Sequence, residues 1–160
     1  MLKSGLLLSL VLVSVQSFAQ EAVVDVSLKP AGSFRGKTTE LKGFATVKGD
    51  SVEAKDIVVD LRHLETGIEL RDEHTRKHLD VTKFPQAVLV SATGKGGVGE
   101  GLIRIRGVEK KINGNYELDG KKLIAKFKLK LSDFNITGIR YMGVGVADEV
   151  SLVVQVLIKK

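Results

Sequence analysis

The stretch Lys122–Ser132, KLIAKFKLKLS, decides the fold class because apolar and charged residues alternate along it. Its apolar side chains share one face, and these are Leu123, Ala125, Phe127, Leu129 and Leu131. Lysines at positions 122, 126, 128 and 130 share the other face, and only Ile124 breaks the pattern. A period of two gives a helix no coherent face, whereas a half-buried strand requires it. The stretch therefore predicts a β-strand with one face in water and the other covered.

Further strands are expected on both sides of this stretch, at residues 23–29, 42–48, 52–64, 87–93, 102–108, 112–118 and 149–158. Asp119-Gly120 is typical of a two-residue hairpin, since both positions tolerate positive φ. Residues 30–36 are predicted to break the first strand, 94–101 to form a mobile loop rich in glycine, and 134–146 a glycine-rich connection. About eight strands joined by such turns indicate an antiparallel sheet that closes on itself or splits into two layers.

The densest cluster of charge, residues 64–87, interrupts the strands. Within it, Ile68–Leu79 repeats at the three-and-four spacing of a helix. Phe84-Pro85 is expected to stop this helix, because proline biases the preceding residue away from helical angles. An eight-stranded barrel has an interior that its own side chains can fill or that can hold one slender ligand. The expected fold is all-β, an antiparallel eight-stranded barrel with one short helix near the rim.

The N-terminus has the features of a secretory signal peptide. Lys3 provides a positive charge, residues 6–15 an apolar core, and Ser17-Phe18-Ala19 small residues at the two positions that a signal peptidase reads. The apolar run is shorter than the roughly 20 residues that span a membrane. We therefore expect residues 1–19 to be removed and residues 20–160 to form one domain. The chain has no cysteine, which excludes disulfides, thiolate catalysis and a lipid anchor on cysteine.

The inward faces of the predicted strands carry mostly small aliphatic side chains. There is no Trp, and aromatic residues are only 5% of the chain. Undersized lining favours an occupied tunnel, although an ordinary aliphatic core fits the pattern equally well. Each buried CH₂ contributes roughly 0.8 kcal/mol, so an isoprenoid or acyl chain would need no charged anchor. A polar head would sit at the mouth, and the expected ligand-binding residues are Phe44, Ile57, Val59, Leu61, Ile103, Ile105, Phe127, Leu129, Leu131, Phe134, Tyr141, Leu152 and Val154.

Other chemistry has weaker support in the sequence. His74 and His78 lie four apart, a spacing that zinc sites use on a helix, and His63 lies just upstream. A metal needs three or four converging ligands, so we expect neither a metal nor a cofactor. The charged residues of the helix are instead expected to tie it to the barrel rim by hydrogen bonds: Arg71, Asp72, His74 and Arg76. No Gly-x-Ser-x-Gly elbow, Walker loop or His-Glu-x-x-His motif is present, which argues against an enzyme.

A basic stripe is expected on the outside of the barrel. It consists of Lys126, Lys128 and Lys130 with Arg104 and Arg106. Stacking aromatic residues are missing between these charges, and the chain has 19 acidic residues against 25 basic ones. The stripe therefore predicts a solvated exterior and no nucleic-acid surface. It leaves room for a weak attraction to anionic membrane surfaces, which would help a carrier to unload.

Three stretches carry a resemblance to a known family: TGIELRDEHTRKHLDVTKFPQA at residues 66–87, GLIRIRGVEK at 101–110 and GVGVADEV at 143–150. They resemble the T-G, R-D-x-H, L-x-V, K-x-P-x-A series, the G-x-L-T-I-x-G-V-x-K strand and turn, and the closing G-V-x-D-x-V strand of the YceI-like family. The opening strand departs from the family pattern, with VVDVSLKPAGSFRGK and no Trp. The resemblance implies a lipocalin-like barrel that holds an elongated apolar molecule, an isoprenoid chain in the best-defined members. It also implies that the acidic pair Asp148-Glu149 bonds to the rim.

The expected function is that of an exported, periplasmic protein that binds an isoprenoid-like lipid as a carrier or store. Two alternatives stay open. An enzyme acting on such a lipid would need a polar residue deep in the tunnel, and a structural or stress-related envelope barrel would have a filled core. The volume of the interior separates the last reading from the other two. The identity of the ligand and the oligomeric state are left open.

Overall fold

One sheet of eleven strands makes up most of the protein. The structure, a computed structural model, describes residues 20–160, and the expected signal peptide, residues 1–19, lies outside the described residues. The strands are β1 (Glu21–Lys29), β2 (Ser33–Thr38), β3 (Leu41–Lys42), β4 (Ala45–Lys48), β5 (Ser51–Asp60), β6 (Gln86–Lys95), β7 (Val98–Ile105), β8 (Val108–Asp119), β9 (Lys122–Lys130), β10 (Arg140–Tyr141) and β11 (Val144–Lys159). The helical segments are η1 (Leu61–His63), α1 (Glu69–Leu79) and η2 (Leu131–Phe134). None of the described helices is long and apolar enough to cross a membrane.

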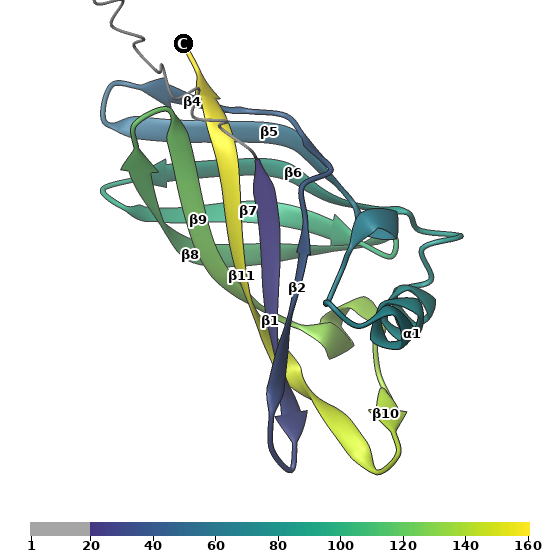
Figure 1. The fold of residues 1–160 in the computed structure, drawn as a ribbon. Coiled ribbons are helices and arrows are strands. Elements are labelled where there is room, and N and C mark those ends of the chain that lie inside the picture. The colour runs from purple at the N-terminus through teal and green to yellow at the C-terminus, as the bar shows by residue number, and fades with distance from the viewer. Residues whose placement is uncertain (1–19) are drawn as a thin grey trace, which may run out of the picture.

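Seven of the strands close into a barrel, in the order β4-β5-β6-β7-β8-β9-β11 (Figure 1). Neighbours in this ring pair antiparallel except β11 and β4, which pair parallel at Ile158–Ala45 and Lys159–Thr46. β1 and β2 extend the sheet from β11, while β3 pairs with β5 and β10 pairs with β11. The prediction of an all-β barrel with a short helix is confirmed. The predicted ring of eight strands and its wholly antiparallel order are wrong.

The difference arises at the seam where the first and last strands of the chain meet. β11 pairs with β9 along one edge and with β1, between Gly145 and Gln155, along the other. Because β1 begins at Glu21, the last residues of β11 lie beyond it and pair with β4 instead. The side chain of Gln20 bridges this seam. Its Oε1 accepts a hydrogen bond from Leu157 N at 2.9 Å, and its Nε2 donates one to Leu41 O at 3.2 Å.

The alternation predicted for residues 122–132 is confirmed in β9. Leu123 and Leu129 are buried, and the lysines at 126, 128 and 130 are exposed on the outer surface. The strand ends at Lys130, two residues earlier than predicted, because Leu131–Phe134 turn into η2. Phe134 has the largest fully buried side chain among the described residues, at 1% exposure. η2 therefore anchors the chain under one end of the barrel.

The mobile loop predicted at residues 94–101 is instead a tight hairpin. β6 runs to Lys95 and β7 begins at Val98, so only Gly96 and Gly97 form the turn. Both have positive φ, 62° and 83°, as a two-residue hairpin requires. The remaining glycines of this stretch lie inside strands. The prediction of a loop was therefore wrong, and glycine has another role here.

Strand glycines allow close approach between neighbouring strands. Gly94, Gly99 and Gly114 lie side by side across β6, β7 and β8. A Cβ atom on Gly114 would lie 2.5 Å from the carbonyl oxygen of Lys126, and one on Gly94 would lie 2.5 Å from the ring of Tyr116. Such distances leave no space for a side chain. The glycine-rich composition, which is typical of loops, here reflects close packing against glycines inside strands.

Two other sequence-based boundaries shift in the structure. Residues 30–36, predicted as a break, contain the start of β2, which pairs with β1 through Val26–Phe34. The predicted connection at 134–146 contains β10 and the start of β11. The helix predicted at 68–79 is confirmed as α1, but Asp80 ends it before Phe84-Pro85. Asp80 takes the left-handed conformation, and its N–H donates to the carbonyls of the last turn.

The end of the molecule opposite the β6–β7 hairpin carries most irregular features. In Figure 1, β1, β2 and β11 run beyond the ring, and α1 and η2 lie beside this extension. α1 contacts η1, while η2 contacts β8, β9 and β11. The helical segments therefore lie at this end of the barrel, beside the extension.

Gly114→Ala is expected to lower the free energy of unfolding by about 1–3 kcal/mol, because the added Cβ collides with backbone atoms of β9. Gly145 in β11 is the matched control. Its φ is not positive, and an added Cβ would meet only Ile139 O at 3.9 Å, so Gly145→Ala should be nearly neutral. Urea denaturation of both variants measures the difference. Equal stabilities would show that close packing at Gly114 is unimportant.

Candidate functional site

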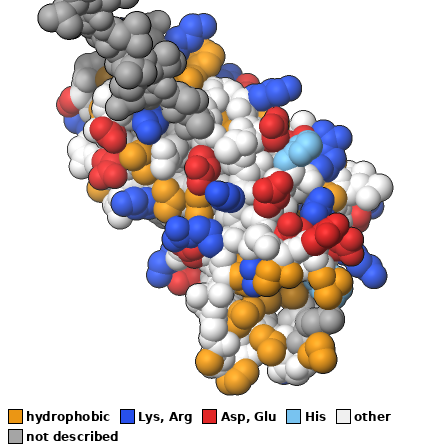
Figure 2. Space-filling view, viewed as in Figure 1, with side chains coloured by type: hydrophobic (Ala, Val, Ile, Leu, Met, Phe, Trp, Pro, Cys, Tyr) orange, Lys and Arg blue, Asp and Glu red, His pale blue; other side chains and the backbone are white. Residues whose placement is uncertain are grey.

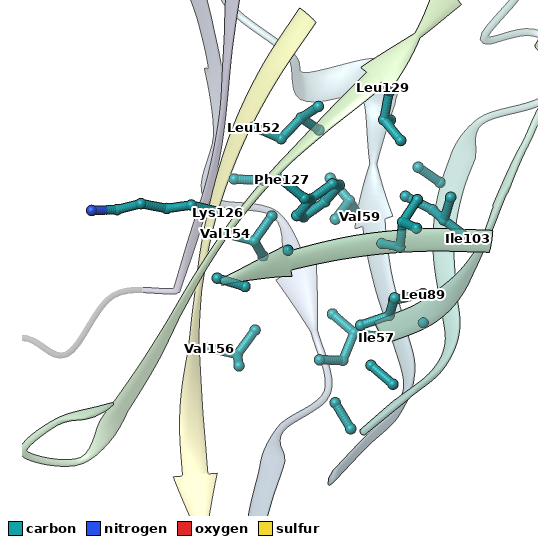
Figure 3. A pocket seen from close by; sticks show the side chains of 18 of the residues that line it. Ile57, Val59, Leu89, Ile103, Lys126, Phe127, Leu129, Leu152, Val154 and Val156 are labelled. Atoms are coloured by element: carbon teal, nitrogen blue, oxygen red, sulfur yellow. The ribbon is translucent and has the colours of Figure 1, made fainter. Parts of the chain in front are cut away.

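The inside of the barrel holds a cavity of about 230 Å³. Inward side chains of the ring strands, η1 and η2 line it, and Figure 3 shows those of Ile57, Ile103, Phe127 and Val154 converging on one space. The alternation of each strand brings them together, because every second residue points to the same face. The sequence-predicted residues that line the cavity are Ile57, Val59, Leu61, Ile103, Ile105, Phe127, Leu129, Leu131, Phe134, Leu152 and Val154.

Two predicted lining residues do not belong to this set. Phe44 lies outside the cavity, 45% exposed, with Lys159 Nζ 4.7 Å from the centre of its ring. The reason is the alternation itself, because Leu41 and Ala45 take the inward positions in the core and Phe44, next to Ala45, points to the opposite face. The placement of Phe44 in the lining was therefore wrong. Tyr141 lies in β10, and its side chain falls outside the described part of the structure.

Several lining residues were missed by the sequence interpretation. Leu89 and Tyr116 point inward from β6 and β8. The alternation of inward and outward residues within the predicted strands 87–93 and 112–118 could have identified both. The other missed positions include leucine, isoleucine and valine residues as well as the strand glycines Gly94, Gly99, Gly101 and Gly114. These four positions contribute backbone and no side chain to the wall. The glycines required for close packing are therefore also part of the cavity wall.

The wall of the cavity is almost wholly apolar. Lys126 belongs to the wall through its place in β9, but its side chain does not enter the cavity. Figure 3 shows this side chain pointing away from the cavity. Glu53 and Glu100 alternate with the inward residues Val52, Ala54 and Gly101, so their carboxylates also face outward. Among the described residues, no carboxylate, amine or imidazole points into this space. The arrangement can exclude water around an apolar molecule, and it offers no acid–base pair for chemistry.

A second cavity, the outer groove, lies between α1 and the extension and has a volume of about 530 Å³. Its wall comes from β1, β2, α1, the segment after η2, β10 and β11. The residues shared with the barrel cavity are Val24, Leu64, Leu79, Leu131, Ile136 and Val150. The two cavities are therefore adjacent and share these apolar side chains. A volume of this size lies within the range of about 300–1,000 Å³ typical of ligand pockets.

A buried hydrogen-bond cluster holds α1 in this position. Asp72 is 8% exposed, and its Oδ1 accepts hydrogen bonds from both the N–H, at 2.6 Å, and the hydroxyl of Thr66. Arg71 donates to Thr66 Oγ1 at 2.9 Å and to Thr66 O at 2.7 Å, and its guanidinium stacks 4.6 Å from the centre of the Phe34 ring. Arg76 Nη1 donates to Arg62 O at 3.4 Å. Arg71 and Asp72 therefore hold α1 to the segment that precedes it, and Arg76 holds it to η1 at the end of β5.

The histidines of α1 line the outer groove. His74 and His78 both contribute to its wall, together with Arg71 and Thr75. Burial lowers the pKa of His78, and the neighbouring His74 and Lys77 lower it further. Among residues 20–160, no group of three or more His, Cys, Asp or Glu side chains is arranged to hold a metal ion. The histidines therefore form part of an apolar groove with a few polar groups.

The acidic pair near the C-terminus bonds to the rim, as the family resemblance implied. Asp148 accepts hydrogen bonds from the N–H of Ser132 at 2.8 Å and from its hydroxyl at 2.7 Å. These bonds hold the pKa of Asp148 below its usual range. Glu149 pairs with Lys128 at 3.0 Å. Asp148 thus fixes η2, and with it Phe134, against β11.

The basic stripe is largely neutralised by neighbouring strands. Lys128 pairs with Glu149 as above, Lys126 lies 3.9 Å from Glu117, and Arg104 lies 2.5 Å from Glu109. Arg106 donates to the carbonyl of Asn135. Cross-strand partners of opposite charge therefore compensate much of this surface.

Asp72→Ala is expected to lower the free energy of unfolding by about 1–3 kcal/mol, because it leaves the buried N–H and hydroxyl of Thr66 without their acceptor. Glu73→Ala is the matched control, since Glu73 is exposed on the same helix. Denaturant titration of both variants measures the difference. An Asp72→Ala variant as stable as Glu73→Ala would mean that the cluster does not hold α1.

A pH dependence is expected from Asp60, which caps η1. Its carboxylate accepts from Arg62 N at 3.0 Å and from Arg62 Nη2 at 2.7 Å, and these hydrogen bonds lower the pKa of Asp60 from 3.8 to about 2. A lowered pKa in the folded state stabilises the fold above the unfolded value of 3.8. That contribution is lost as the pH falls towards 2. Unfolding free energies measured from pH 6 to pH 2, an interval chosen around these values, should fall less steeply for Asp60→Asn than for the parent; parallel curves would refute the assignment.

Comparison with known proteins agrees with this architecture. The family model described as the YceI-like domain matches residues 14–158. No curated protein sequence matches the chain. Among solved structures, a polyisoprenoid binding domain from Saccharophagus degradans implicated in plant cell wall breakdown superposes with a TM-score of 0.58 at 14% identity, covering 88% of this chain and 93% of that one. BcnA of Burkholderia cenocepacia superposes with a TM-score of 0.65 at 17% identity, covering 87% and 96%.

At these identities the solved structures establish a shared fold. The family model covers nearly the whole chain, including the segments TGIELRDEHTRKHLDVTKFPQA, GLIRIRGVEK and GVGVADEV that carry the resemblance. The predicted family is therefore confirmed. This chain belongs to the YceI-like domain family.

Proposed function

We propose that this protein binds an elongated apolar molecule of the isoprenoid or isoprenoid-quinone type inside its barrel and acts as a carrier or store in the cell envelope. The observation that carries the proposal is the apolar cavity of about 230 Å³ within the ring, which lies next to the outer groove. In this proposal a slender chain enters the barrel from the side of the groove. The solved structure described as a polyisoprenoid binding domain supports the ligand class.

The energetics favour an apolar chain over a polar molecule. Each CH₂ group moved from water into this wall contributes roughly 0.8 kcal/mol, so the interior needs no charged anchor for tight binding. A charged group inside would lose its hydration and find no side chain of opposite charge among the inward side chains described above. Polar side chains occur in the outer groove, where Arg71, His74 and Arg140 contribute to the wall. The apolar chain is therefore placed in the barrel and its head group in the groove.

The two alternative functions have less support. A structural barrel with a filled core would leave no such cavity, whereas a water molecule needs only about 10–15 Å³ of this kind of volume. An enzyme acting on a bound lipid would need a polar reacting group in the barrel, where the described side chains provide no carboxylate, amine or imidazole. Binding without catalysis is the function proposed. The signal-peptide pattern of residues 1–19 supports export to the periplasm.

The proposal predicts that protein purified from native envelope material without detergent carries an apolar compound. Organic extraction followed by mass spectrometry should recover a chain-like lipid in stoichiometric amount. The same experiment on two variants of β9 tests the place of binding. Recovery of no stoichiometric apolar compound from the parent protein would contradict the proposed function.

Ala125→Phe adds a ring to the cavity side of β9 and should reduce ligand recovery at least about tenfold, which corresponds to roughly 1.4 kcal/mol of binding free energy. Ile124→Phe adds a ring to the outer side of the same strand, one residue away, and should leave recovery unchanged. Thermal unfolding checks that both variants are folded. Equal recovery from the two variants would place the ligand outside the barrel.

A further inference from the structure

Two neighbouring hairpins at the end of the extension expose apolar side chains. The β1–β2 hairpin at residues 27–34 and the β10–β11 hairpin at residues 139–146 are here named the tip hairpins. Their register places them side by side, because Leu28 pairs with Val146, and Gly145 pairs with both Lys29 and Arg140. Figure 2 shows hydrophobic side chains gathered at this end of the molecule. The tip hairpins therefore form one continuous surface.

Exposed hydrophobic residues are concentrated around this surface. Of the eight large hydrophobic residues that are exposed in the described part of the chain, four line the outer groove: Ile68 at 54%, Leu70 at 51%, Met142 at 85% and Val144 at 38%. Single exposed hydrophobic residues need no explanation, but a patch of them at the mouth of a groove marks an interaction site. The remaining question is which partner covers it.

Met142 is the most exposed of the four and occupies the turn of the second tip hairpin. Met142 and Gly143 have φ values of 49° and 80°, so both central positions of a two-residue turn lie in the left-handed region. Asn-Gly is the preferred pair for such a turn, and methionine is unfavourable there. The side chain is also unfavourable in water. The left-handed backbone and the exposed apolar side chain are both unfavourable at Met142. These two costs at one residue indicate that its side chain serves to contact an apolar partner.

The charges of the tip hairpins identify the kind of partner. Residues 27–34 and 139–146 contain Lys29 and Arg140 and no acidic residue. Nearby, Asp25 pairs with Arg35 at 2.7 Å, and Asp148 accepts hydrogen bonds from Ser132 within the field of both Lys130 and Lys29. A symmetric contact between two copies would bring the cations of both copies together without a compensating acid. An anionic bilayer offers acyl chains for the apolar residues and phosphates for the cations.

We propose that the tip hairpins dock on an anionic lipid bilayer. Met142 and Val144 insert between the head groups, and Lys29 and Arg140 lie against lipid phosphates. The mouth of the outer groove then faces the membrane. This surface is separate from the basic stripe, whose cations are largely paired. The inference rests on exposure, turn geometry and charge, so it holds whether or not the barrel carries a ligand.

Co-sedimentation with vesicles tests the proposal, with no ligand added. The parent protein should bind vesicles of mixed phosphatidylcholine and phosphatidylglycerol, and bind pure phosphatidylcholine vesicles more weakly. Met142→Asn should weaken binding at least about tenfold, while the thermal midpoint of unfolding stays the same or rises, because Asn suits positive φ. Lys29→Glu should weaken binding to the mixed vesicles and have little effect on the neutral ones.

Val98→Thr is the matched control, because Val98 is 62% exposed at the β6–β7 hairpin, at the opposite end of the barrel. It should bind vesicles as the parent protein does. A parent protein that binds neither kind of vesicle, or an equal loss in Val98→Thr and Met142→Asn, would overturn the proposal. A Met142→Asn variant that turns a lipid-free dimer into a monomer in sedimentation velocity would also overturn it, in favour of self-association. Lipid extraction tests ligand binding in the barrel, and vesicle co-sedimentation tests docking of the tip hairpins. Each proposal can therefore fail without the other.

Discussion

Close approach of strands at Gly94, Gly99, Gly101 and Gly114 is the constraint on which the rest of the structure depends. Side chains at Gly94, Gly101 and Gly114 would come within 2.5–2.8 Å of neighbouring atoms, and all four glycines line the cavity. In a ring this narrow, aliphatic side chains on every inward position would meet at the centre. The glycines replace part of that lining by backbone alone. Neighbouring atoms, among them the ring of Tyr116, occupy the space beside these glycines, so the wall of the cavity can pack closely.

The helical cap decides how this interior connects with the surface. Asp72 and Arg71 hold the start of α1 to Thr66 and Phe34, and Asp148 holds η2 to β11. Leu79 and Ile136, carried by these segments, contribute to both the barrel cavity and the outer groove. The cap therefore carries apolar side chains that border both cavities. Arg71, Asp72 and Asp148 contribute to the cavities by holding these segments in position.

Sequence reasoning succeeded where structure depends on neighbouring residues. The alternation in β9 predicted which side chains enter the barrel, and the three-and-four spacing predicted α1. It failed where distant strands meet. The glycines of 94–101 have the composition of a loop, and only their contacts with Tyr116, Ser91 and β8 show why they lie in strands. The parallel junction between β11 and β4 arises because β1 begins at Glu21, a boundary that no local pattern specifies.

The sequence by itself determined the all-β class, the family, the helix and part of the inward residues, because side-chain direction along a strand follows from the backbone's own period. Only the tertiary structure decided that the ring has seven strands, that Phe44 lies outside it, and that the inward side chains enclose a hollow next to a groove behind α1. These properties depend on the distance between strands that are far apart along the chain. That distance is fixed by packing, and the period of any one strand does not contain it.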